Sequence, residues 1–168
     1  EVLRRPGWVP GSVAADVAAA LEVFDGAELI SPDLERRVRA ALAPNPWVSK
    51  VGAVRPLFPS RLAVSLEVRR PVARVRTREG AVPVGPDGVR VPWAAGERPG
   101  HPFPEVVAGV FPSPPAPGKG FADPAIAAGA ALAEILAREA GSWLLRRLPI
   151  AAIDVSNHAG RRDRRQSE

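Results

Sequence analysis

The stretch NPWVSKVGAVRPLFPSRLAVSLEVRRPVARV, residues 45–75, predicts two strands joined by a turn. Trp47 and the valines after it favour a pleated, half-buried surface. Apolar and polar residues then alternate over 62–69, which is typical of a strand with one face on a core and one in water. Pro56 and Pro59 indicate a short turn between the strands, because proline fixes φ and removes a backbone donor. The stretch therefore predicts an antiparallel hairpin.

The hairpin should supply much of the core around it. Pro71 should end the second strand, since proline cannot donate a ladder hydrogen bond. The side chains expected in the core are Trp47, Val48, Leu62, Val64 and Leu66.

Helices are expected before the hairpin. The first should span about residues 13–22, with Ser12 as its N-cap and apolar residues at helical spacing behind it. The second should begin at Ser31, with Pro32 in the first helical position. Its apolar stripe comprises Leu34, Val38, Ala41 and Leu42. Its charged residues, expected on a solvated face, are Glu35, Arg36, Arg37 and Arg39.

The second half of the chain is richer in strands and turns. Residues 85–88 (GPDG) predict a turn, and residues 92–122 predict loops. Asp123 and Pro124 should open a long helix as N-cap and first residue. Its inner face should hold Ile126, Ala130, Ala133 and Leu136, with Leu132 and Ile135 beside them. Strands are expected at 72–76, 82–84, 89–91 and 148–155.

These patterns predict an α+β protein. Residues 1–70 form a two-helix domain with a small sheet, in which the helices cover one face of the sheet. Residues 71–168 form a mixed, strand-rich β domain with one long helix.

Composition limits the classes of function. The 168 residues carry a net charge of +5 and no cysteine, which excludes a disulfide framework and a thiolate metal site. No run of about 18 apolar residues is present, so no membrane span is expected within the chain. The positive charge is compatible with nucleic-acid binding. Tyrosine is absent and no recognition helix stands out, so we do not expect nucleic acid as the partner.

No catalytic constellation is evident. His101 and His158 are the histidines of the chain, and neither has a spaced histidine or a paired carboxylate nearby. The segment 117–120 (PGKG) lacks the spacing of a phosphate-binding loop. We therefore expect no enzyme activity, no cofactor and no metal.

The hairpin motifs resemble those of a known family. Residues 45–48 (NPWV), 55–62 (RPLFPSRL) and 69–73 (RRPVA) resemble the polypeptide-transport-associated (POTRA) domain of FtsQ/DivIB bacterial cell-division proteins. Residues 150–156 (IAAIDVS) resemble the strand that follows a helix in the β domain of that family. The glutamate that the family has before Arg69 is replaced here by valine.

The resemblance implies the extracytoplasmic part of a single-span membrane protein. Its cytoplasmic tail and span would precede Glu1, and it would lie on the periplasmic side of the inner membrane at the division site. It would be a non-enzymatic divisome scaffold that binds small coiled-coil proteins of the FtsB and FtsL type. Further C-terminal strands of the β domain, which hold much of the family's partner-binding edge, would be missing.

Partner strands could be added at two candidate sheet edges, residues 62–68 and residues 150–156. The candidate partner-binding residues are Arg55, Arg69, Arg70, Pro71, Ile153 and Val155.

Two alternatives stay open. The chain could be a POTRA module of an outer-membrane assembly or secretion protein, or a basic nucleic-acid-binding module. The arginine-rich segment 161–165 is expected to be a solvated turn, with contact to anionic lipid as the alternative.

Overall fold

The chain folds into two α+β units, and the expected fold class is confirmed. The units meet between Arg69 and Arg70, one residue before the boundary expected from the sequence. The computed structural model describes residues 9–24, 31–57, 61–92, 103–111, 113–139 and 150–160.

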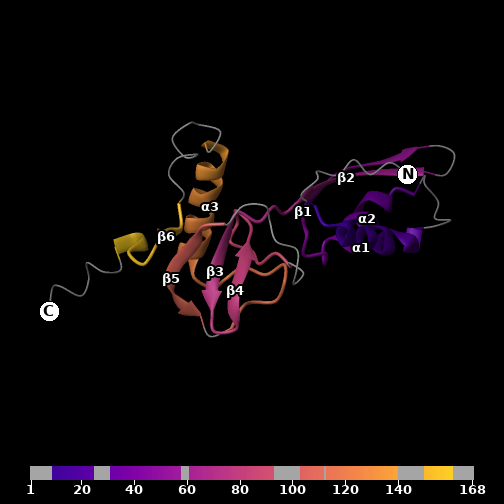
Figure 1. The fold of residues 1–168 in the computed structure, drawn as a ribbon. Helices are drawn as coiled ribbons and strands as arrows, with labels where there is room; N and C mark the ends of the chain where they lie inside the picture. Colours follow the sequence, from indigo (N-terminus) through magenta and orange to yellow (C-terminus); the bar gives the residue numbers. More distant parts are fainter. Residues whose placement is uncertain are drawn as a thin grey trace. The chain divides into compact units, whose positions relative to one another are not determined.

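The first unit contains two helices and a hairpin (Figure 1). Strands β1 and β2 pair antiparallel in a two-stranded sheet. Helix α2 packs on α1 and on β1. The elements are α1 (Gly11–Leu21), a 3-10 turn η1 (Glu22–Phe24), α2 (Leu34–Leu42), β1 (Val48–Leu57) and β2 (Arg61–Val68). The buried apolar side chains are Val9, Val13, Val17, Leu34, Val38, Leu42, Trp47, Val48 and Val51.

Helix α1 begins one residue before Ser12, so the predicted N-cap is wrong. Pro10 occupies the N-cap position, and its carbonyl accepts the Val13 N–H at 3.2 Å. Ser12 lies exposed in the first turn. Proline suits this position because it has the extended backbone of a cap and its own carbonyl can start the helix.

Helix α2, in contrast, begins later than expected, at Leu34. The Ser31 carbonyl accepts the Leu34 N–H at 3.1 Å, and its hydroxyl accepts the Asp33 N–H at 3.4 Å. Residues 31–33 thus form a turn ahead of the helix. The predicted stripe is confirmed at Leu34, Val38 and Leu42, which are all buried.

Strand β1 runs through Pro56, where a turn was predicted, and ends at Leu57. The Arg69 N–H donates to the Trp47 carbonyl at 2.7 Å, so odd-numbered residues of β2 direct their backbone groups toward β1. Pro56 pairs with Leu62, whose backbone groups therefore point away from β1. The missing N–H of Pro56 costs no ladder hydrogen bond, and the strand tolerates it.

The core expectation for the hairpin needs a correction. Trp47 and Val48 are buried, whereas Leu62, Val64 and Leu66 are only half-buried. The reason is that α2 packs against β1, which leaves the apolar row of β2 partly uncovered.

The second unit is a four-stranded sheet with one helix (Figure 1). The strand order is β4-β3-β5-β6, with β3 and β4 antiparallel and the other pairs parallel. Helix α3 packs on β3, β5 and β6. The elements are β3 (Ala73–Thr77), β4 (Gly80–Val84), β5 (Glu105–Phe111), α3 (Pro124–Glu139) and β6 (Ala152–Asp154), with a 3-10 turn η2 (His158–Gly160).

Strand β5 corrects the expectation that residues 92–122 are loops. It lies inside the sheet, between β3 and β6. Its sequence, EVVAGVF, is nearly continuous in apolar residues rather than alternating, as is usual for a parallel strand. Val106 at its centre is 1% exposed and packs with Ile126 and Ile153.

Helix α3 begins as predicted, because the Asp123 carboxylate accepts the Ala125 N–H at 2.9 Å. Its inner face buries Ile126, Ala130 and Ala133. Leu132 and Ile135 were expected beside this face, but they lie exposed on the outer side. Helix α3 is therefore rotated about its axis so that small residues such as Ala130 and Ala133 face the sheet. Their small side chains allow the helix to approach the sheet closely.

The end of the chain is described in part. The strand expected over 148–155 is shorter and spans Ala152–Asp154. Earlier in the chain, the predicted turn at 85–88 is confirmed, because the Gly88 N–H donates to the Gly85 carbonyl at 3.0 Å. Residues 140–149 and the arginine-rich segment 161–165 lie outside the described residues.

The contact between α3 and β5 predicts a packing-sensitive position at Gly129. A Cβ added there would meet Val106 Cγ1 at 2.7 Å. We expect Gly129→Leu to lower the free energy of unfolding by ~2 kcal/mol or more, because an overfilled core must shift its neighbours. Ala131→Leu, on the exposed side of the same helix, should change it by less than ~0.5 kcal/mol. Urea unfolding followed by circular dichroism measures both, and equal stabilities would contradict this packing.

Candidate functional site

Strand β1 contains a β-bulge at each of two positions. Pairing shifts by one residue between Val48 and Lys50, and again between Val51 and Val54. The additional residues lie in β1, so β2 stays regular. A bulge leaves backbone groups without ladder partners and therefore needs another source of hydrogen bonds.

Arg39 supplies those hydrogen bonds at the second bulge. From the last turn of α2, its guanidinium donates to the Val51 carbonyl and, at 2.8 Å, to the Gly52 carbonyl. Glu35, one turn earlier, accepts from the same guanidinium at 2.7 Å. The expectation that Arg39 lies on a solvated face holds only in part, because 43% of its side chain is exposed while its guanidinium contacts the backbone of β1. The available signal was its position between Val38 and Leu42, at the border of the apolar stripe.

Arg69 has the same role at the first bulge. Its Nη1 donates to the Pro46 carbonyl at 3.0 Å and to the Val48 carbonyl at 2.7 Å. The Asn45 side chain accepts the Trp47 N–H at 2.9 Å, which fixes the turn into the strand. Arg69 is a candidate partner contact by sequence, but its side chain hydrogen-bonds to backbone carbonyls at the start of β1.

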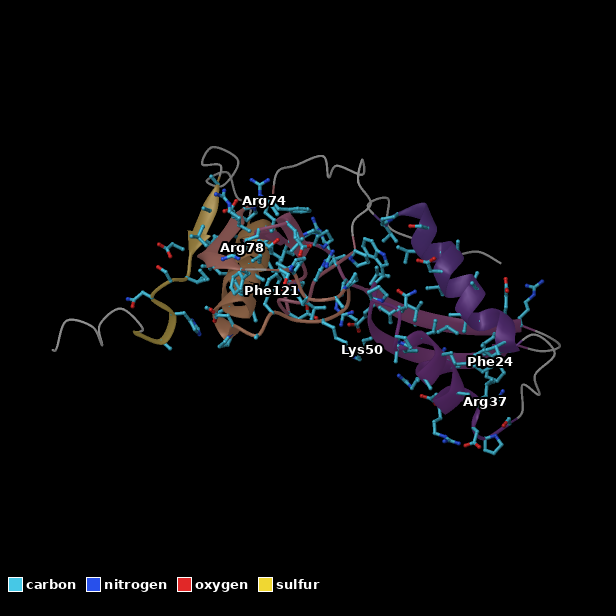
Figure 2. The ribbon with its side chains drawn as sticks, turned by 90° about the horizontal axis from the view of Figure 1, so that it is seen from below. Phe24, Arg37, Lys50, Arg74, Arg78 and Phe121 are labelled. Atoms are coloured by element: carbon cyan, nitrogen blue, oxygen red, sulfur yellow. The ribbon has the colours of Figure 1, made fainter. Side chains whose placement is uncertain are left out.

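A shallow hollow of about 280 Å³ lies along β1 between the two arginines. Lys50 also lines it (Figure 2), and its ammonium lies 3.5 Å from the Glu67 carboxylate. Arg39 and Arg69 already donate to backbone carbonyls. The cations around the hollow therefore have partners within the unit. Its lining residues are Arg39, Ala43, Val48, Ser49, Lys50, Val51 and Arg69.

The outer edge of β2 has a different character. No strand lies beside it among the described residues. The strand contains neither a proline nor a bulge over 61–68. Its outward backbone groups belong to Leu62, Val64, Leu66 and Val68, by the alternation that the Arg69 to Trp47 hydrogen bond sets. A regular row of outward N–H and C=O groups is a template for a further strand.

The other candidate contacts fall into two groups. Arg55 and Arg70 are exposed and available to a partner. Pro71 and Ile153 are buried, and Val155 packs against the core of the second unit. Pro71 and Ile153 therefore cannot offer their side chains to a partner in this conformation, whereas Val155 is half-buried.

The β6 edge can still be defined. The Ala151 carbonyl accepts the Glu105 N–H, and the Val155 N–H donates to the Val107 carbonyl, both at 2.9 Å. The residues in between alternate, so the backbone groups of Ala152 and Asp154 point away from β5. This edge is only three residues long.

Arginines also lie on the sheet face opposite α3. Ala73, Val75 and Thr77 are buried, while Arg74 and Arg76 alternate with them and are exposed (Figure 2 labels Arg74). Arg76 forms two contacts with the Glu105 carboxylate, at 2.9 and 3.1 Å. This ion pair neutralises part of the face, so β3 does not present a continuous basic track.

The described residues contain no group of three or more histidine or acidic side chains that could hold a metal ion. Among the helices of the described residues, none is long and apolar enough to cross a membrane. Scans against protein-family models, curated proteins and solved structures return no match for this chain.

The contrast between Arg69 and Arg70 gives a stability prediction. Arg69→Ala leaves the Pro46 and Val48 carbonyls without their donor, and we expect it to lower the free energy of unfolding by ~1–3 kcal/mol. Arg70→Ala removes an exposed side chain next to it and should change this quantity by less than ~0.5 kcal/mol. Urea unfolding followed by tryptophan fluorescence measures both variants. A larger loss for Arg70→Ala would contradict the structural role of Arg69.

Proposed function

We propose that this chain is the extracytoplasmic part of a single-span divisome scaffold of the FtsQ/DivIB type. It would act without catalysis, at the division site on the periplasmic side of the inner membrane. Its partners would be small coiled-coil membrane proteins of the FtsB and FtsL type, bound through protein–protein contacts.

The correspondence between motifs and structural elements carries this proposal. The NPWV motif forms the turn into β1, where Asn45 accepts the Trp47 N–H. The RRPVA motif connects β2 to β3, across the boundary between the units. The IDVS motif provides β6, which follows α3 and pairs in parallel with β5. This correspondence supports the proposal.

Partner binding by strand addition suits the edge of β2. Main-chain hydrogen bonds supply affinity in this mode, and alternate side chains supply specificity. The half-buried row Leu62, Val64 and Leu66 could bury the apolar side chains of an added strand. Arg55, exposed on β1, is available as a polar contact.

The two alternatives predict other behaviour. A POTRA module of an outer-membrane assembly or secretion protein would occupy the whole envelope rather than the septum. A nucleic-acid-binding module would show an affinity that falls steeply with salt. The Arg76–Glu105 ion pair neutralises part of the basic face of the second sheet, so this face does not favour nucleic-acid binding. The pair also gives no support to an assembly module.

The position of a fluorescently tagged full-length protein in growing cells tests the proposal. We expect a band at the division site. A uniform envelope signal would favour the assembly module, and a signal over the nucleoid would favour nucleic-acid binding; either result would overturn the proposal.

A pair of proline variants tests the use of the β2 edge. Val54 and Val64 are paired across the hairpin, and the backbone N–H groups of both point outward. Val64→Pro removes a donor from the β2 edge and should abolish the septal band, because proline cannot bond to an added strand. Val54→Pro, the matched control, removes a donor from the β1 edge and should leave the band unchanged. Hydrogen exchange of the hairpin amides shows whether each variant is folded, and a normal band with folded Val64→Pro would exclude this edge.

A further inference from the structure

The end of the β1–β2 hairpin places two arginines and a leucine on one face. Leu57 pairs directly with Arg61 across the hairpin, and Arg55 lies two residues before Leu57 in the same strand. Side chains that are paired across strands, or that lie two positions apart in one strand, project from the same face of a sheet. Arg55, Leu57 and Arg61 therefore form one surface cluster, which we call the hairpin-end cluster.

All three side chains of the hairpin-end cluster are in contact with solvent. Leu57 is 48% exposed, although it is a large apolar residue. Arg55 and Arg61 are exposed beside it. A lone exposed leucine is ordinary on a protein surface, so the two neighbouring cations are what distinguish this one.

The positive charge of this hairpin face is concentrated at its end. Further along the same face, Lys50 pairs with Glu67, and their charged atoms lie 3.5 Å apart. Arg55 and Arg61 have no ion-pair partner within the described residues. Their guanidinium groups are thus available to an anion from outside the chain, and the planar fork of a guanidinium suits the oxygens of a phosphate.

We propose that the hairpin-end cluster contacts the surface of an anionic lipid bilayer. Arg55 and Arg61 bind headgroup phosphates, and Leu57 between them lies at the boundary with the acyl chains. This contact goes beyond the proposed function, because it gives the first unit a lipid partner of its own and needs no divisome protein.

The composition of the cluster favours a bilayer over other anionic partners. A nucleic acid is held mainly by many cations along its phosphates, whereas this face offers two arginines, and its lysine is already paired with Glu67. A bilayer surface presents phosphates and apolar chains within one contact. It therefore satisfies the arginines and the leucine together.

Two arginines produce a weak attraction by themselves. Each basic residue near an anionic membrane surface strengthens binding by about fivefold. In the proposed single-span protein this is sufficient, because attachment to the same membrane would raise the effective concentration of lipid around the cluster. The unattached chain should bind measurably when lipid is in large excess.

Co-sedimentation with vesicles tests the proposal. We expect the purified chain to bind vesicles of phosphatidylglycerol and phosphatidylcholine, but not vesicles of phosphatidylcholine alone. Arg55→Gln combined with Arg61→Gln should weaken binding by about fivefold for each arginine removed. Arg74→Gln combined with Arg78→Gln is the matched control, since it removes the same charge from exposed positions of the second unit, and it should bind like the unchanged chain.

A second set of variants tests the position of Leu57. Leu57→Gln should weaken binding, whereas Ile135→Gln, which replaces a side chain of α3 that is 56% exposed, should not. The chain contains no cysteine, so Leu57→Cys provides a single site for an environment-sensitive fluorophore. Its emission should shift to shorter wavelength with anionic vesicles, and the emission of the same label at Ala131→Cys, exposed on α3, should stay unchanged.

Several results would overturn the lipid contact, with circular dichroism used to verify that each variant is folded. Absence of binding to anionic vesicles would do so, as would an unchanged emission at position 57. Equal losses for the two arginine pairs would reduce the effect to net charge and would also refute it. Binding of polyglutamate in place of vesicles, through the same arginines, would assign the cluster to an acidic protein partner. The septal band of the tagged protein is a separate measurement, so this inference and the proposed function can fail independently.

Discussion

Hydrogen bonds from two arginines to the carbonyls of a bulged strand hold the first unit together. Strand β1 has an extra residue at each bulge, and its freed carbonyls would be costly if they were half-buried without donors. Arg39 brings α2 onto the strand, and Arg69 ties the end of β2 to the start of β1. The hydrophobic stripe of α2 supplies part of the buried core, and these hydrogen bonds fix where along β1 the helix lies.

The sequence was most informative where pattern and backbone chemistry agree. The hairpin, the stripe of α2, the cap at Asp123 and the turn at 85–88 followed from periodicity and from turn residues. Helix starts were displaced because a proline carbonyl or a preceding turn replaced the expected side-chain cap. The prediction of a turn at Pro56 is wrong because a proline disrupts a strand only where its backbone faces the partner strand. Which residues face the partner is set by the pairing of β1 with β2, and this pairing cannot be deduced from the local sequence.

The candidate contacts were harder to predict for a related reason. Arg69 and Arg70 are identical in type and adjacent in sequence, yet one donates to two carbonyls and the other is exposed. Ile153 belongs to the core because α3 covers that face of β6. Strand β5 was missed because its parallel partners lie far away in sequence, and its apolar run resembles a loop segment when prolines and glycines surround it.

The junction between the units is short, and this has a mechanical consequence. The Arg69 N–H still bonds to Trp47, and the Val72 N–H already bonds to Val84, so only Arg70 and Pro71 lie between two anchored backbones. A force that pulls the two units apart would act on these two residues, which have almost no length left to extend. Pulling would therefore load the hydrogen bonds at the ends of β2 and β3, from Arg69 to Trp47 and from Val72 to Val84, without first straightening a linker.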